Sequence, residues 1–114
     1  MAKKNTPQYE AKLAYYDKLV EQCPRFDRKG KTMPYTSANG YMFSLLNKAG
    51  ELGIRFSKEV QENYFKKFNT ENYISYNAVM KGYILLTPEM EKDEKLLVEL
   101  LNESYDYVMS LEPK

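Results

Sequence analysis

The sequence predicts an α+β fold, in which an antiparallel β-sheet is flanked by N-terminal, middle and C-terminal helices. Three observations support this fold class. Residues 31–56 have the pattern of a β-meander, three other segments have helical periodicity, and strands do not alternate with helices as a parallel sheet requires. A chain of 114 residues is expected to form one domain. We therefore assign residues 1–114 to a single domain, with residues 1–5 as a polar tail.

The first expected element is a helix over residues 7–23. Apolar side chains recur along it every three or four residues, at Tyr9, Leu13, Tyr16, Val20 and Cys23. Thr6 suits the N-cap and Pro7 suits the first helical position, where no backbone N–H is needed. Pro24 then ends the helix, because it cannot continue the hydrogen-bond pattern.

The meander of residues 31–56 is expected to hold about three strands. Asn39-Gly40 predicts a tight turn, because both residues tolerate positive φ. Residues 41–46 are apolar except for one serine, residues 47–51 interrupt this pattern, and apolar residues then alternate from 52 to 56. Phe43 and Ile54 are expected in the core on one face of the sheet.

The second half of the chain predicts two helices and one later strand. The middle helix is expected to begin after Ser57, a good N-cap, and to end at Asn69-Thr70. Residues 71–81 show no clear period and predict a loop or a short strand. Residues 83–87 predict a short buried strand, and residues 91–111 predict one long helix, with an acidic first turn after Pro88.

The composition argues against several classes of protein. The net charge of +1 gives no overall field that would attract nucleic acid or a membrane surface. One cysteine excludes an internal disulfide and suits a reducing compartment. No apolar stretch resembles a secretory signal or a membrane span. These features predict a soluble cytoplasmic protein that does not contact a membrane.

The chemistry that the residues offer is limited. The chain has no histidine, which removes the most common general base and the usual zinc ligand. It has no phosphate-binding glycine loop, and the carboxylates of residues 89–94 lack the spacing of a calcium loop. Cys23 fits the apolar stripe of the first helix as a core residue, with a reactive thiol as the alternative. We therefore expect no catalytic residues, no metal and no cofactor.

Four cations follow the first helix within seven residues and form a segment that we call the basic segment: Arg25, Arg28, Lys29 and Lys31. One interpretation is a solvated loop, or pairing with the acidic start of the last helix. The other is a contact surface for an acidic protein partner or for weakly bound nucleic acid. Tyr35 is a further candidate binding residue, because its place in the fold is less certain than that of the helical tyrosines.

Tyrosine is abundant, with eleven in the chain. The four at helical core positions are expected to be buried there: Tyr9, Tyr16, Tyr64 and Tyr105. Four others are better candidates for an exposed aromatic surface, on which nucleic-acid bases could stack: Tyr35, Tyr41, Tyr73 and Tyr76.

Charge is unevenly distributed along the chain. Residues 1–31 hold eight cations and four acids, whereas residues 89–114 hold eight acids and three lysines. The two segments could attract each other within the fold or between two copies in a homodimer. Alternatively, the basic half could face an acidic partner.

Several short motifs resemble the strand core of the TfoX/Sxy N-terminal domain family. They are KTM at 31–33, NGYMFSL at 39–45 and GELGIR at 50–55. Residues 80–89 resemble the family's later strand and Pro-Glu helix start, and residues 103–114 are similar to the end of the related MmcQ/YjbR family. The resemblance covers about residues 28–112. Pro34-Tyr35 replaces the Phe-Gly-Gly that usually follows the methionine, and the C-terminal helical domain of full-length TfoX regulators is absent.

The resemblance implies an α+β fold and a link with competence regulation or DNA binding, and it supplies no catalytic residues. Two function classes follow. The first is a small non-enzymatic binding or regulatory module acting through protein contacts or weak nucleic-acid contacts. The alternative is an enzyme or small-molecule-binding protein with a histidine-free site built from Tyr, Arg, Lys and carboxylates.

Overall fold

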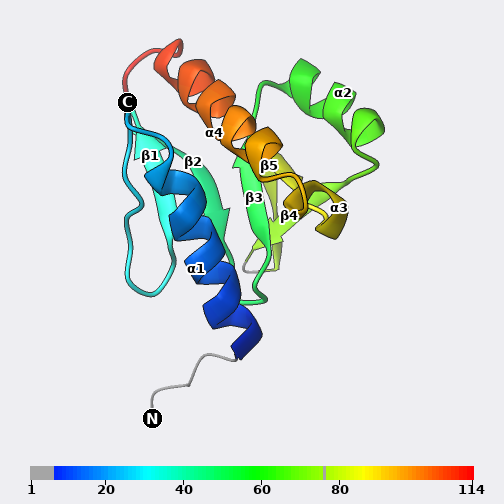
Figure 1. Cartoon of the computed structure of the whole chain (residues 1–114). Helices are drawn as coiled ribbons and strands as arrows, with labels where there is room; N and C mark the ends of the chain where they lie inside the picture. Colours follow the sequence, from blue (N-terminus) through cyan, green and yellow to red (C-terminus); the bar gives the residue numbers. More distant parts are fainter. Residues whose placement is uncertain (1–6, 76) are drawn as a thin grey trace.

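A single antiparallel sheet with helices along one side forms the frame of the molecule (Figure 1). The computed structural model describes residues 7–75 and 77–114. Over these residues the elements are α1 (Pro7–Glu21), β1 (Tyr35–Ala38), β2 (Tyr41–Leu46), β3 (Leu52–Arg55), α2 (Lys58–Lys67), β4 (Asn72–Ser75), β5 (Ala78–Leu85), α3 (Pro88–Glu91) and α4 (Glu94–Met109). The strand order is β1-β2-β3-β5-β4, and all neighbouring strands are antiparallel. The predicted fold class is confirmed.

The meander and the first two helices match the predictions closely. β1 and β2 are joined at Asn39-Gly40, where φ is 57° and 85°, as the turn requires. The hydroxyl of Ser57 accepts a hydrogen bond from the backbone N–H of Val60 and caps α2. α1 ends at Glu21, two residues earlier than predicted, because the next two N–H groups form tight turn bonds to the carbonyls of residues 19 and 20.

The helix predicted over residues 91–111 is confirmed as α4, which begins three residues later and ends two residues earlier, and a short separate helix, α3, precedes it. α3 begins after Thr87, whose side chain accepts a hydrogen bond from the N–H of Met90. α4 begins after Asp93, whose carboxylate accepts one from the N–H of Leu96. The second cap breaks the helix, since Asp93 satisfies the N–H groups of a new helical turn.

Residues 71–81 hold the short strand β4, one of the two predicted alternatives, together with the first residues of β5, with which β4 forms a β-hairpin. β4 pairs with β5 through Ile74 opposite Val79 and Ser75 opposite Ala78. β5 therefore begins five residues before the predicted strand at residue 83. Asn77 takes a φ of 61° in the connecting turn, and this conformation is tolerated by asparagine. The missing period reflects a register shift within this pair of strands.

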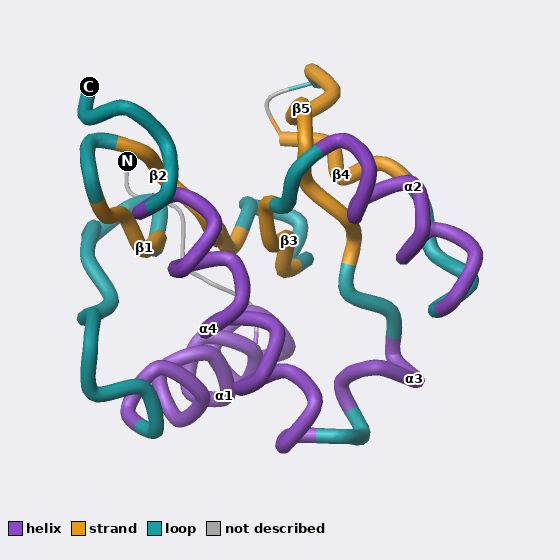
Figure 2. The backbone as a smooth tube through the Cα atoms, turned by 90° about the horizontal axis from the view of Figure 1, so that it is seen from above, coloured by secondary structure: helices purple, strands orange, loops and turns teal. Residues whose placement is uncertain are grey.

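The main core lies between the sheet and the helices α1 and α4, which cover the same side (Figure 2). Phe43 and Ile54 are buried there, as predicted. Of the four helical tyrosines, Tyr16 is fully buried and Tyr9, Tyr64 and Tyr105 pack against the cluster while partly exposed. Burying these large side chains against one face of the sheet supplies the main stabilising term for the fold.

The opposite side of the sheet, which we call the back face, carries a second cluster. Leu45, Tyr73 and Tyr83 are buried in it, and five half-buried side chains pack around them: Met33, Tyr35, Met42, Met80 and Leu85. The β4–β5 hairpin turns away from α1 and α4 on this side (Figure 2). The hydroxyl of Tyr73 donates to the carbonyl oxygens of Leu45 and Glu51, at 3.0 and 2.8 Å, which ties the hairpin to β2 and β3.

Tyr73 therefore corrects one prediction. It was expected on an exposed aromatic surface, whereas its ring is fully buried. The predictions for the tail at residues 1–5, for the cap at Thr6 and for Tyr76 fall outside the residues that the structure describes. Among the described helices, none has both the length and the apolar character needed to cross a membrane.

Candidate functional site

Arg28, at the centre of the basic segment, is bound to the protein itself. Its Nε lies 2.6 Å from Oδ1 of Asp17 on α1, and its Nη2 lies 3.3 Å from Oδ2 of the same carboxylate. Nη1 donates to the carbonyl of Gly30 at 2.7 Å. Hydrogen bonding to Asp17 raises the pKa of Arg28 above its usual value. This two-point contact fixes the loop after α1 and leaves little of the guanidinium for a partner.

Arg25 is likewise held within the fold. Its Nη1 lies 2.8 Å from Oδ1 of Asp106, and its Nη2 lies 3.0 Å from Oδ1 of Asn102, both on α4. The guanidinium also lies over the ring of Tyr105, 4.5 Å from its centroid. Hydrogen bonding to Asp106 raises the pKa of Arg25. Arg25 thus links the loop to the last helix, and its exposed ion pair adds little stability.

The remaining candidates lie together at the free edge of β1. Lys29 exchanges two backbone hydrogen bonds with Tyr35, at 2.7 and 2.9 Å, and so extends this edge. The side chains of Lys29 and Lys31 are exposed, and neither forms an ion pair with any residue in 7–75 or 77–114. Tyr35 is half-buried in the cluster of the back face. The structure therefore separates the five candidates into two arginines with internal partners and a group of three at this edge.

The neighbours of Tyr35 on the back face were not identified from the sequence. They are Met33, Met42, Met80 and Leu85. For Met42 the sequence does contain an indication, because neighbouring residues of a strand lie on opposite faces and Phe43 is in the main core. Met42 accordingly lies on the back face. No described helix packs over this cluster, so its half-buried methionines contact solvent (Figure 2). Exposed apolar side chains grouped in this way are typical of a surface that contacts another molecule.

The back face offers few tyrosine rings for base stacking. The buried rings of Tyr73 and Tyr83 stack on each other, with centroids 5.8 Å apart. The hydroxyl of Tyr83 donates to the carbonyl of Met42 at 2.8 Å. Burial raises the pKa of both tyrosines. Of the tyrosines in this cluster, Tyr35 is the one whose ring is partly exposed.

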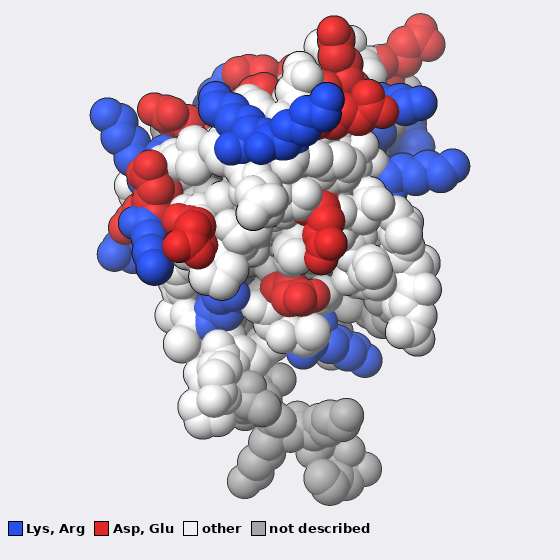
Figure 3. Space-filling model, turned by 90° about the vertical axis from the view of Figure 1, so that its right-hand side faces the viewer, with Lys and Arg blue, Asp and Glu red and all other residues white. Residues whose placement is uncertain are grey.

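Charge on the β4 side gives no extended basic patch. In the space-filling view of this side, Lys and Arg are interspersed with Asp and Glu, and a broad area at the right has no charged side chains (Figure 3). Two of the large apolar residues exposed in the described chain, Ile74 and Val79, face each other across the β4–β5 hairpin. Neither feature matches the continuous basic surface that nucleic acid requires.

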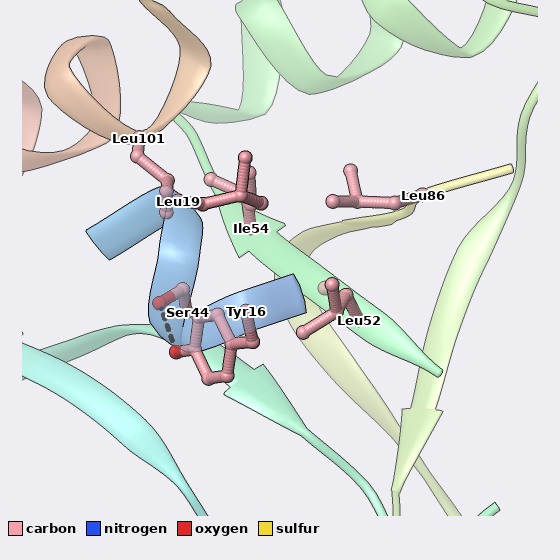
Figure 4. A pocket seen from close by; sticks show the side chains of 8 residues that line it. Tyr16, Leu19, Ser44, Leu52, Ile54, Leu86 and Leu101 are labelled. Carbon is pink, nitrogen blue, oxygen red and sulfur yellow. Dashed lines mark hydrogen bonds between the residues drawn. The ribbon is translucent and has the colours of Figure 1, made fainter. Parts of the chain in front are cut away.

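The hollow inside the main core cannot hold a ligand, because it leaves no space for a water molecule. Side chains from α1, β2, β3 and α4 fill it, among them Tyr16, Leu19 and Leu101 (Figure 4). The hydroxyl of Tyr16 lies 2.5 Å from Oγ of Ser44, which in turn lies 2.5 Å from Oγ1 of Thr36. These buried hydroxyl groups satisfy one another and have a structural role.

A second hollow, of about 390 Å³, opens at the C-terminal end of α1. Its lining includes Cys23, Phe26 and the carboxylates of Glu21 and Asp27. Cys23 is 2% exposed and burial raises its pKa, so it stays a neutral thiol. This position confirms its predicted place in the core. Among the described residues, no group of three or more His, Cys, Asp or Glu side chains is placed to hold a metal ion.

The chain gives no match in comparisons with protein-family models, with curated proteins or with solved structures. The resemblance to the TfoX N-terminal domain therefore stays a prediction.

Proposed function

We propose that this protein is a small non-enzymatic binding module, and that it binds another protein at the β1 side of the back face. The contact surface, which we call the docking surface, consists of Lys29, Lys31, Met33, Tyr35 and Met42. One observation carries the proposal: half-buried apolar side chains without a covering helix lie next to two exposed lysines that have no ion pair among the described residues.

The chemistry of the docking surface suits a protein partner. Methionine adapts its shape to a neighbouring surface, and tyrosine combines an apolar ring with a polar tip. Both types are enriched in protein interfaces, whereas lysine is found mostly at the rim. We infer that Met33 and Met42 contact apolar groups of the partner, while Lys29 and Lys31 face acidic groups. The lysines then chiefly raise the rate of association.

Nucleic acid is the weaker candidate for the partner. Arg25 and Arg28 are held by Asp106 and Asp17, so two cations of the basic segment remain for phosphate contacts. Two contacts predict a slope of only about −2 in a plot of log affinity against log salt concentration. The resemblance of residues 28–112 to a regulatory family supports a binding role in general, and it does not favour one class of partner.

The test is affinity capture from a lysate of the source cell, with quantitative mass spectrometry. Wild type is compared with Lys29→Glu/Lys31→Glu, which reverses the rim charge, and with Met33→Gln, which removes an apolar contact. The expected result is one protein whose recovery falls about fivefold or more with each variant, because interface contacts of this kind contribute about 1 kcal/mol or more. Recovery should also fall as salt is raised, more for wild type than for Lys29→Glu/Lys31→Glu.

The matched control is Lys66→Glu/Lys95→Glu, which reverses two exposed lysines on α2 and α4. This control changes the net charge equally and should leave recovery unchanged. Equal loss with the control would contradict the docking surface. Capture that disappears after nuclease treatment would identify nucleic acid as the partner instead.

A further inference from the structure

Arg55, the last residue of β3, has a side chain whose donors are not used within the fold. Arg55 is half-buried as a residue, and its guanidinium forms no hydrogen bond and no ion pair with any residue in the described ranges 7–75 and 77–114. It lies instead beside two aromatic rings, 5.3 Å from the centroid of Tyr41 and 5.8 Å from that of Tyr107. The contrast with Arg25 and Arg28 is clear, since both of those side chains bind carboxylates.

A second cation lies against the same ring. Nζ of Lys114 is 5.3 Å from the centroid of Tyr41, and its ammonium also forms no ion pair with a described residue. Backbone contacts hold it there. The N–H of Lys114 donates to the carbonyl of Asn39 at 3.3 Å, and the hydroxyl of Tyr41 donates to the carbonyl of Glu112 at 2.7 Å.

Whether Arg55 and Lys114 can still bind an anion depends on the type of group that each contacts within the fold. A carboxylate would neutralise the guanidinium and occupy its N–H donors, as Asp17 does for Arg28. An aromatic ring attracts a cation through its face and leaves both the charge and the N–H groups available. Tyr41 and Tyr107 therefore position Arg55 without consuming its capacity to bind an anion.

We propose that Arg55 and Lys114 form an anion-binding site for a phosphate group. The planar fork of Arg55 matches two phosphate oxygens, and the positive charge of Lys114 at the same ring adds a longer-range attraction for the anion. Two cations balance the charge of a phosphate monoester near neutral pH better than that of a single carboxylate. The site is built by β2, β3, α4 and the last residue, and it shares no residue with the docking surface, so either proposal can fail alone.

The test is a titration followed by NMR of the arginine Nε–H groups and by thermal melting, in a buffer of low chloride content. The probes are inorganic phosphate and acetate at millimolar concentrations. Phosphate should shift the Nε–H signal of Arg55 in a saturable manner and raise the melting temperature, because a ligand that binds the folded state stabilises it. Acetate, with one charge, should bind about tenfold or more weakly.

Three variants locate the site. Arg55→Gln should weaken phosphate binding about tenfold or more. Arg55→Lys keeps the positive charge but loses the planar fork, so its affinity for phosphate should lie between those of Arg55→Gln and wild type. Lys114→Gln leaves the β3 position intact and should weaken binding several-fold, so it tests the site even if Arg55→Gln does not fold. The matched control is Lys67→Gln, because Lys67 also lies over two aromatic rings, those of Tyr64 and Phe68.

A second pair of probes identifies the source of the phosphate group. Glycerol phosphate represents a small phosphate ester, and O-phosphoserine in a short peptide represents a phosphorylated protein. Tighter binding of the peptide assigns the site to a protein ligand, and tighter binding of the ester assigns it to a metabolite. The proposal is overturned if phosphate gives no saturable shift at Arg55, or if Lys67→Gln weakens binding as much as Arg55→Gln.

Discussion

Gly53 and Tyr73 show how a single residue fixes the back face. A Cβ at Gly53 would lie 2.5 Å from Cγ and Cδ2 of the Tyr73 ring, far inside normal contact distance. The ring has no room to retreat, because its hydroxyl is bound to the carbonyls of Leu45 and Glu51. Glycine at this position therefore lets a ring from β4 cover β3 directly.

We predict that Gly53→Ala destabilises the protein by about 2 kcal/mol, since overpacking a close contact typically costs 1–3 kcal/mol. Urea denaturation of wild type and variant measures this difference. The decisive comparison is the same substitution in a Tyr73→Leu background. Without the ring, alanine should be neutral or slightly stabilising, because glycine weakens a strand. An equal cost in both backgrounds would show that the ring contact is not the cause.

The sequence predicts the position of Gly53 in this contact but not that of Tyr73. Alternation across residues 52–56 places Gly53 on the face opposite to Ile54, as the structure confirms. The burial of Tyr73 depends on the bend of the β4–β5 hairpin over a strand that is twenty residues away in the chain. No local period in residues 71–81 encodes that bend, so Tyr73 was assigned to an exposed surface.

At the scale of elements, Asn39 joins the β1–β2 turn to the end of α4. Its Nδ2 donates to the carbonyl oxygens of Val108 and Leu111, at 2.9 and 2.8 Å. The last carbonyls of a helix lack partners within the helix, so this side chain acts as a cap supplied by a distant turn. Asn39 also takes the positive φ of 57° that the turn needs.

Two substitutions separate the roles of Asn39 in the turn and at the helix end. Asn39→Gly keeps the positive φ and loses the cap, and it should cost about 1 kcal/mol. Asn39→Asp also tolerates the φ, but places a carboxylate against the negative end of α4, and it should cost about 1 kcal/mol more at neutral pH. Urea denaturation and amide exchange near Val108 measure the effect. Equal stability of the two variants would contradict the capping role.

Helices whose apolar residues recur with a clear period could be predicted from the sequence. The break between two helices and the limits of a hairpin could not, because they depend on which capping and strand-pairing contacts form. α1 follows from its apolar spacing, and α2 follows from its apolar spacing and its cap at Ser57. The division between α3 and α4 depends on Asp93 acting as a second cap within an apolar pattern that continues on both sides. The start of β5 depends on its pairing with β4, which periodicity alone does not reveal.

At the scale of the whole molecule, the uneven charge distribution is used within the fold. Three ion pairs connect the basic first part to the acidic last part: Lys12 with Glu91 at 3.0 Å, Lys18 with Glu94 at 3.4 Å and Arg25 with Asp106 at 2.8 Å. The first two pairs join α1 to α3 and to α4, and the third joins the loop after α1 to α4. The sequence could predict that these segments attract each other. It could not predict which cations stay free, because that depends on the acids that the fold brings near.

Buried tyrosines make the whole fold sensitive to alkaline pH. Burial raises the pKa of Tyr16, Tyr73 and Tyr83, and burial together with a hydrogen bond to Glu103 raises the pKa of Tyr64 to about 12. In the unfolded chain these groups lose their protons near pH 10. Above that pH the unfolded state binds fewer protons than the folded state, so stability falls as pH rises and is unaffected well below pH 10.

We predict that the free energy of unfolding decreases between about pH 10 and pH 11, by about 1.4 kcal/mol per pH unit for each tyrosine that keeps its proton in the fold. Urea denaturation at a series of pH values measures the slope, and tyrosinate absorbance reports the ionisation directly. Tyr83→Phe removes one titrating group and one hydrogen bond, to the carbonyl of Met42. Its slope should be shallower than that of wild type by the contribution of one proton, although its stability at pH 7 is lower. Lysine titration contributes equally to both proteins and cancels in the difference. Identical slopes would mean that Tyr83 ionises in the folded state as readily as in the unfolded chain.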